Sequence, residues 1–171
     1  MSIDVIASRI MDELNFVKTV DRSHALIHEG IGYSHSLSTT VIAASTHFCL
    51  ITTPNTTMEP CFLFNASAHA AASMSLYENP TAASTGVATY TPLNDNRRST
   101  KTATVTIMTV ASSDVTSTGT LMESYATGII GGDIAGGHEW LLAQNEQYLL
   151  KINSASTNTI HYNMFWTEDE L

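Results

Sequence analysis

The chain has 171 residues, a length at which one domain with a single buried core is the usual arrangement. Its formal net charge of −9 argues against sequence-independent binding of nucleic acid, because such binding needs Lys and Arg to displace counterions from phosphates. No apolar run approaches the roughly 18 residues of a membrane helix, and the N-terminus lacks the regions of a secretory signal, so we expect cytoplasmic synthesis and no membrane partner.

The surface is expected to be solvated by hydroxyl groups rather than by charges. Only 13% of the residues are charged, against about 25% in an ordinary domain, and 42 of the 171 are Ser or Thr. A lightly charged surface gives weak protection against association. We therefore expect neighbouring subunits to cover part of it; a Ser/Thr-rich monomer is the alternative.

The first predicted element is an amphipathic helix over residues 2–20. Apolar side chains recur there every three or four residues, and Ser2 is available as a cap. The apolar positions are Ile3, Ile6, Ile10, Leu14 and Val17. The polar face lacks the Lys and Arg of a membrane-surface helix. We expect residues 1–23 to form a helix or arm that packs on the chain's own core or docks on a partner, ahead of one domain at 24–171.

Strands are predicted for the rest of the chain. Short β-branched, aromatic or alternating runs, bounded by turn residues, are typical of strands with one face buried. They occur at 25–28, 36–44, 47–53, 61–64, 68–78, 102–110, 138–143, 147–152 and 159–166. Nine or ten short strands at this spacing predict an all-β, antiparallel β-sandwich or jelly roll.

Three segments are expected to be irregular. Residues 129–137 are rich in Gly but lack the order of a phosphate-binding loop, which favours a flexible connection. Ser-Thr-Gly occurs at 84–86 and again at 117–119, which suggests two similar excursions of the chain rather than a solenoid. Residues 168–171 are expected to form an acidic tail.

Two cysteines do not make a disulfide framework. Cys49 and Cys61 lie symmetrically about Asn55, so a hairpin centred there would place them opposite each other. Buried thiols remain the favoured interpretation for a protein made in a reducing compartment.

No catalytic, cofactor or metal site is predicted. The seven histidines show no HxH or HExxH spacing, and His24 and His28 fall on a predicted strand, where residues four apart are distant. The sequence has no GxSxG elbow, and Cys49 and Cys61 lie in apolar runs that raise a thiol pKa. We therefore expect a protein that is not an enzyme.

A cluster of positive charge stands out against the net charge. Three of the seven basic residues, Arg97, Arg98 and Lys101, fall within five positions, next to Asn94 and Asn96. Arg binds carboxylates through a planar fork, which suits a subunit interface. A solvated loop in which the two asparagines supply turn conformations is the alternative.

Four short motifs carry a resemblance to a known group of proteins. They are Ile27-His28-Glu29-Gly30 with Tyr33, Leu76-Tyr77-Glu78 with Pro80-Thr81 and Gly86, Asn94-Asp95-Asn96-Arg97-Arg98-Ser99, and Asn145-Glu146-Gln147-Tyr148-Leu149. Together they resemble small virion structural proteins of tailed bacteriophages, the capsid decoration or cement proteins of the phage head. The likeness covers most of residues 24–166 and leaves out the predicted helix at 2–20.

The resemblance implies a jelly-roll β-sandwich that assembles as a homotrimer on the outer capsid surface of the virion. There it would bridge subunits of the major capsid protein and reinforce the shell. It brings no catalytic residues and no cofactor. From their chemistry, we predict Arg97, Arg98, Asn94 and Asn96 as subunit-interface residues and the arm at 1–23 as the capsid-docking element.

Two other functions remain open. A receptor- or glycan-binding module of a phage fibre or spike would use displayed aromatic rings, and the candidates are Tyr33, Tyr90, Tyr125 and Trp140, although strand aromatics are more often core residues. A cupin-like metalloenzyme would require a bound metal ion.

Overall fold

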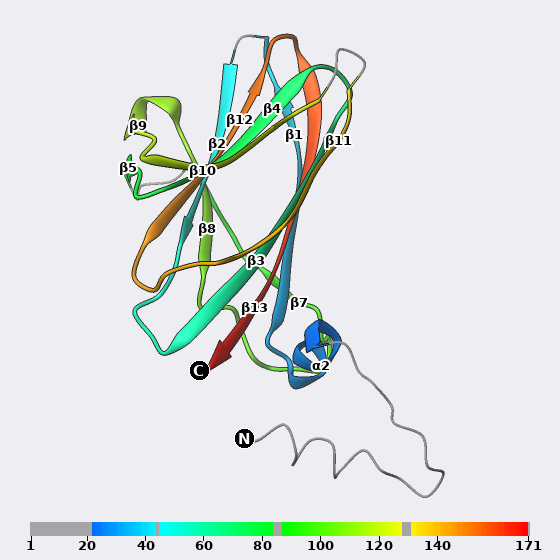
Figure 1. The fold of residues 1–171 in the computed structure, drawn as a ribbon, viewed down its shortest axis with the longest axis vertical. Coiled ribbons are helices and arrows are strands. Elements are labelled where there is room, and N and C mark those ends of the chain that lie inside the picture. The colour runs from blue at the N-terminus through cyan, green and yellow to red at the C-terminus, as the bar shows by residue number, and fades with distance from the viewer. Residues whose placement is uncertain (1–21, 44, 84–86, 128–130, 171) are drawn as a thin grey trace, which may run out of the picture.

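The computed structural model describes residues 22–43, 45–83, 87–127 and 131–170. The helix predicted at 2–20, with its apolar positions, lies outside these residues. The described chain forms two antiparallel sheets that pack face to face, with the helix α2 (Arg22–Glu29) at one end (Figure 1). The predicted all-β sandwich is therefore confirmed.

Eleven strands build the two sheets, and a small ribbon lies beside them. In spatial order, the five-stranded sheet contains β11 (Gly132–Leu141), β3 (Met58–Ala68), β13 (Asn158–Glu170), β1 (Gly32–Val41) and β7 (Leu93–Asn94). The six-stranded sheet contains β10 (Thr120–Ala126), β4 (Ala72–Glu78), β12 (Gln147–Ser154), β2 (Ser45–Thr52), β8 (Thr106–Val110) and β6 (Ala88–Tyr90). The ribbon pairs β5 (Thr81–Ala82) with β9 (Val115–Ser117), which follows a 3-10 turn (Ser112–Asp114).

The eight long strands have the connectivity of a jelly roll. Four of them form the order β11-β3-β13-β1 and the other four the order β10-β4-β12-β2. Apart from the β4 to β10 step, each successive long strand moves to the opposite sheet, which is the double Greek key of a jelly roll. Both β1 and β13 therefore lie in one sheet although they are at opposite ends of the domain.

The chain between β4 and β10, residues 79–119, forms a long insertion. It supplies β8 and β6 at the edge of one sheet and β7 at the edge of the other. Its two ends, β5 and β9, pair with each other. The second Ser-Thr-Gly copy begins at the last residue of β9, while residues 84–86 of the first lie outside the described part of the chain.

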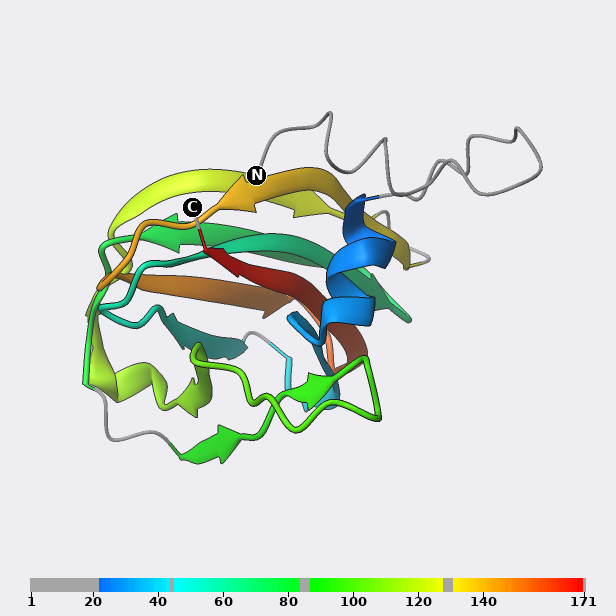
Figure 2. The ribbon, with the colours of Figure 1, turned by 90° about the horizontal axis from the view of Figure 1, so that it is seen from below.

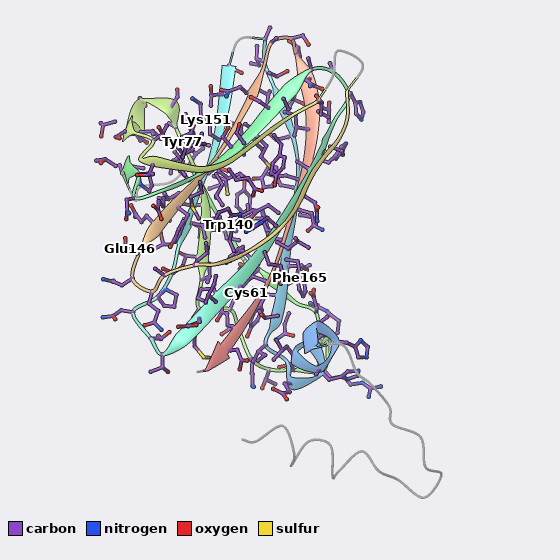
Figure 3. All side chains as sticks on the ribbon, in the orientation of Figure 1. Cys61, Tyr77, Trp140, Glu146, Lys151 and Phe165 are labelled. Carbon is purple, nitrogen blue, oxygen red and sulfur yellow. The ribbon has the colours of Figure 1, made fainter. Side chains whose placement is uncertain are left out.

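Aromatic side chains form the centre of the main core. Tyr33, Trp166 and Phe62 are in register across β1, β13 and β3, and Trp140 on β11 continues the row. The rings of Phe62 and Trp166 stack with centroids 4.8 Å apart and an angle of 8°. Both are fully buried, so this row contributes large apolar area as well as ring stacking. Side chains from both sheets fill the space around Trp140 (Figure 3).

The insertion covers the other face of the six-stranded sheet. Phe48, Leu50, Leu149 and Val110 form a second buried cluster there. Val115 of β9 and Ala82 of β5 pack against it. Both faces of β2 are consequently apolar, which explains why residues 47–53 form a continuous rather than an alternating run.

The segment 25–28, predicted as a strand, is helical. Gly30 has φ +76° and follows the last helical residue. Its N–H donates to the Ile27 carbonyl at 2.9 Å, and the Ile31 N–H donates to the Leu26 carbonyl at 3.1 Å. This pair of bonds is a Schellman cap, so the glycine stops a helix instead of bending a strand.

The predicted loop at 129–137 and the predicted acidic tail are also wrong in part. Residues 132–137 belong to β11, which pairs with β3 through a register shift between Ala135 and Glu139. Pairing with a complete neighbouring strand overrides the low strand propensity of glycine. At the C-terminus, β13 extends to Glu170, and Glu168 is only 1% exposed.

The two cysteines do not face each other. Cys49 on β2 lies in one sheet and Cys61 on β3 in the other, because the connection between these strands crosses the sandwich. Neither forms a disulfide. Burial raises the pKa of the Cys49 thiol to about 12, so this thiol is unreactive in the folded protein.

A polar cluster lies inside the sandwich. His35 is 8% exposed and packs against the ring of Tyr90 with centroids 4.6 Å apart. Among the described residues, its Nε2 atom has no hydrogen-bond partner. His47 approaches the Tyr162 hydroxyl at 3.2 Å. Burial lowers the pKa of both His35 and His47, so both rings are held neutral.

This cluster predicts acid sensitivity. An unfolded histidine binds a proton near pH 6.5, whereas the buried rings do not, so the unfolded chain takes up more protons below that pH. The free energy of unfolding is then highest above pH 6.5 and falls as the pH decreases towards 5, by up to about 1.4 kcal/mol per pH unit for each histidine. Urea unfolding of the wild type and of His35→Phe across this range measures it.

The variant should show a shallower pH dependence because one of the two titrating rings is gone, and His161→Gln, at an exposed position, should keep the wild-type slope. Parallel profiles for wild type and His35→Phe would contradict the assignment.

Candidate protein-binding interface

The loop at residues 94–101 brings the insertion to the same end of the sandwich as α2. Figure 2 shows α2 beside the stretch that follows β7, with the last part of β13 alongside. The predicted interface residues Asn94, Asn96, Arg97 and Arg98 all lie in this loop. Its geometry is determined by side-chain hydrogen bonds to neighbouring elements.

Asn94 joins three parts of the chain. Its side-chain amide donates to the Gly30 carbonyl at 2.8 Å and to the Lys101 carbonyl at 3.0 Å. Its side-chain oxygen accepts the Asn96 N–H at 2.9 Å, which forms an Asx turn. The two ends of the loop and the cap of α2 are therefore held by one side chain.

Asn96 repeats this arrangement two residues further on. Its amide donates to the His28 carbonyl in the last turn of α2 at 2.9 Å. Its oxygen accepts the Arg98 N–H at 3.1 Å. The backbone that carries Arg98 is thus tied to the helix. Both asparagine amides are used within the chain, and their assignment to a subunit interface stays a prediction.

Asp95, which the sequence argument did not single out, connects the loop to β1. Its carboxylate accepts the Ser34 hydroxyl at 2.6 Å, and its N–H donates to the Gly32 carbonyl at 3.0 Å. The Asn-Asp-Asn composition is a recognisable turn signal. Its partners, however, are about 60 residues away in sequence and are set by the tertiary fold.

Glu168 holds the segment that follows the loop. Its carboxylate accepts the N–H groups of Thr104 (2.9 Å) and Val105 (3.1 Å), the Thr104 hydroxyl (2.6 Å) and the indole N–H of Trp166 (3.0 Å). A buried carboxylate needs such partners because desolvation without them is costly. The end of β13 therefore fixes residues 104–105 next to the aromatic row.

The two arginines are left exposed by this arrangement. Arg97 and Arg98 are both exposed, and we find no ion pair for either guanidinium among the described residues. Leu93, one residue before Asn94, is 56% exposed. A fixed backbone with exposed Arg and Leu side chains is suited to binding an acidic protein surface, because little backbone conformational freedom remains to be lost on association.

The aromatic residues considered for glycan binding belong to the core instead. Tyr33 is 2% exposed, and its hydroxyl donates to the Gly30 carbonyl at 3.4 Å. Tyr90, Tyr125 and Trp140 are partly buried and pack against the main core. The Trp140 indole N–H donates to Glu123 at 2.8 Å. They follow the usual behaviour of aromatics at strand positions.

A groove with both polar and apolar lining crosses the outer face of the five-stranded sheet. Its volume is about 540 Å³, and its outward side chains come from β1, β13 and β3. They are Ser36, Ser38, His161, Asn163, Asn65 and Ser67. The Ser36 hydroxyl donates to the Asn163 side-chain oxygen at 2.9 Å. This face offers hydroxyl, amide and imidazole groups without a formal charge.

Metal ligands do not gather in the described part of the chain, where no three His, Cys, Asp or Glu side chains form a binding group. The separation expected for His24 and His28 is wrong, since both lie on α2 with their Nε2 atoms 2.9 Å apart. The four-residue spacing is the sequence signal for this contact, because residues four apart are neighbours on a helix but not on a strand.

No family model matches the chain, and no match is found among curated proteins or solved structures. Within the described residues, no helix has the length and apolar composition needed to span a bilayer. The inference of function therefore depends on the surface chemistry above.

The role of Asn94 can be tested directly. Asn94→Ala removes two donated hydrogen bonds and one accepted bond, so local opening of the loop should become about 1–3 kcal/mol easier. Hydrogen exchange measured by mass spectrometry should show faster exchange over residues 95–101 and unchanged exchange over β12. Asn163→Ala, on the outer sheet face, is the matched control and should leave the loop unaffected. Unchanged loop exchange in Asn94→Ala would show that the asparagine does not hold it.

Proposed function

We propose that this protein is a virion structural protein that decorates the outer capsid surface of a tailed bacteriophage. On this proposal it is made in the host cytoplasm, assembles as a homotrimer and bridges subunits of the major capsid protein without enzymatic activity or cofactor. The jelly-roll fold is compatible with this role but is shared by proteins of many functions. The surface feature that supports this role is the loop at 94–101.

The observation that supports the proposal is that Arg97 and Arg98 are exposed on a backbone that Asn94 and Asn96 bind to the C-terminal end of α2. The chain has a net charge of −9, so two adjacent arginines on a fixed loop make a small positively charged surface on an acidic protein. The sheets do not need these side chains, since neither packs in the core. The two exposed guanidinium groups are instead suited to binding carboxylates on a neighbouring protein.

The N-terminal arm belongs to the same proposal. Residues 1–21 precede α2 in the sequence, and Asn96 of the arginine loop donates to the His28 carbonyl of α2. Two contacts from one chain would strengthen attachment to a capsid, because the second contact forms at high effective concentration.

Co-sedimentation with expanded capsids that lack decoration protein tests the function. Wild-type protein should pellet with the capsids and saturate. Arg97→Ala/Arg98→Ala should keep the fold and bind at least tenfold more weakly, as expected for loss of arginine contacts worth more than about 1 kcal/mol each. Native mass measurement of the same samples reports whether the trimer persists.

Lys151→Ala is the matched control, since it removes a cation from β12 and should bind as the wild type does. A chain beginning at residue 22 asks whether the arm is needed. Wild-type protein that remains in the supernatant would refute the capsid function. Wild-type affinity in the double-arginine variant would instead refute only the role of the loop.

The groove on the outer face of the five-stranded sheet favours a second function, binding of a glycan by a fibre or spike module. Amide and hydroxyl groups pair with sugar hydroxyls, and Phe165 presents a half-buried ring in the neighbouring row of the same face (Figure 3). A glycan array should then give a ligand whose binding Asn65→Ala/Asn163→Ala abolishes and Asn153→Ala, in the other sheet, preserves. An empty array would leave the capsid function as the one supported proposal.

A further inference from the structure

The two histidines of α2 form a pair with unusual geometry. His24 and His28 are one helical turn apart, and both are exposed. Their ring centroids are 4.6 Å apart at an angle of 71°, and the two Nε2 atoms are 2.9 Å apart. Two nitrogens that can bind a metal ion therefore lie close to each other on the exposed side of the helix.

This separation matches two ligands of one metal ion. Imidazole nitrogens bind first-row metals at about 2.0–2.1 Å, so two ligands at a right angle are about 2.8–3.0 Å apart. At the tetrahedral angle the separation is about 3.3–3.4 Å. The observed 2.9 Å is the length of a hydrogen bond between the two rings, and it shows that both nitrogens lie close enough to reach one ion.

We propose that His24 and His28 form an exposed two-histidine site for a divalent transition-metal ion, with Cu²⁺ favoured because nitrogen ligands bind it most tightly of the divalent first-row ions. Helical histidines four residues apart are an established way of presenting two nitrogens to one ion. Water completes the coordination, because the described residues contain no third protein ligand at this place. The site is independent of the proposed capsid function.

Binding requires only a rearrangement of hydrogens. In the free protein the two Nε2 atoms share a hydrogen bond, and the tautomers of the two rings determine which one is the donor. When the ion binds both Nε2 atoms, the donor ring carries its hydrogen on Nδ1 after exchange with solvent, and no proton is released overall. A protonated ring has no lone pair for the metal, so acid competes with the ion.

The site is connected to the arginine loop. The carbonyl of His28 accepts the Asn96 amide, and Asn96 accepts the N–H of Arg98. An ion that joins two consecutive turns of α2 therefore stabilises the helical end to which the loop is tied. Metal binding should reduce hydrogen exchange in α2 and, through Asn96, at Arg98.

The test is titration of CuCl₂ and NiCl₂ into the full chain, purified without a polyhistidine tag, by calorimetry at neutral pH. One ion should bind per chain, and His24→Gln or His28→Gln should each weaken binding at least tenfold. Electron paramagnetic resonance of the Cu²⁺ complex should show two coordinated nitrogens in the wild type and one in either variant. At pH 5 the wild type should lose most of its affinity.

Two further variants make the result specific. His138→Gln changes an exposed histidine elsewhere and should bind as the wild type does. His161→Gln tests the other pair of exposed neighbouring histidines, His69 and His161, whose ring centroids are 5.6 Å apart. Thermal unfolding without metal checks that each variant is folded. Loss of binding in His161→Gln with retention in His28→Gln, or no stoichiometric binding by the wild type, would overturn the proposal.

Discussion

The contact on which the rest of this structure depends is the packing of the β13 side chains against the opposite sheet. This strand lies in the middle of the five-stranded sheet, between β3 and β1. Trp166, Met164, Tyr162 and Ile160 all point inward and are buried. Because the stacked Trp166 and Phe62 rings occupy the centre of the row, the register of β1, β3 and β13 follows from it.

The same strand also organises the surface. Two residues beyond Trp166, Glu168 fixes the backbone at 104–105, and from there the insertion runs back to the loop at 94–101. Asn94 and Asn96 then attach that loop to the cap of α2. The buried Glu168 carboxylate and the side-chain amides of two asparagines thus fix the backbone of this insertion. The fixed backbone presents Arg97 and Arg98 at the surface. The proposed capsid contact and the two-histidine site both lie at this end, although neither inference requires the other.

Several features could be predicted from local patterns. Alternation of apolar and polar residues at 68–78 and 159–166 predicts strands because side chains on a strand point to opposite faces. A strand position also favours the core for the aromatic residues considered for glycan binding, and they pack there. The cluster of Asn and Arg at 94–98 was recognisable as a turn with surplus charge. The elements that this turn binds could not be predicted, because its partners Gly30, His28 and Ser34 are more than 60 residues away in the sequence.

From the order of amino acids alone one obtains the all-β class, the approximate strand segments and the position of the charged turn, because these depend on periodicity and composition over a few neighbouring residues. The tertiary structure decided the rest. It placed Cys49 and Cys61 in different sheets, made a strand of the glycine-rich residues 132–137 and buried Glu168. It also made a capped helix of residues 22–29, which brings two histidines together that a strand would keep apart. Each of these outcomes depends on partners that are distant in sequence or on a cap, and a local pattern does not specify them.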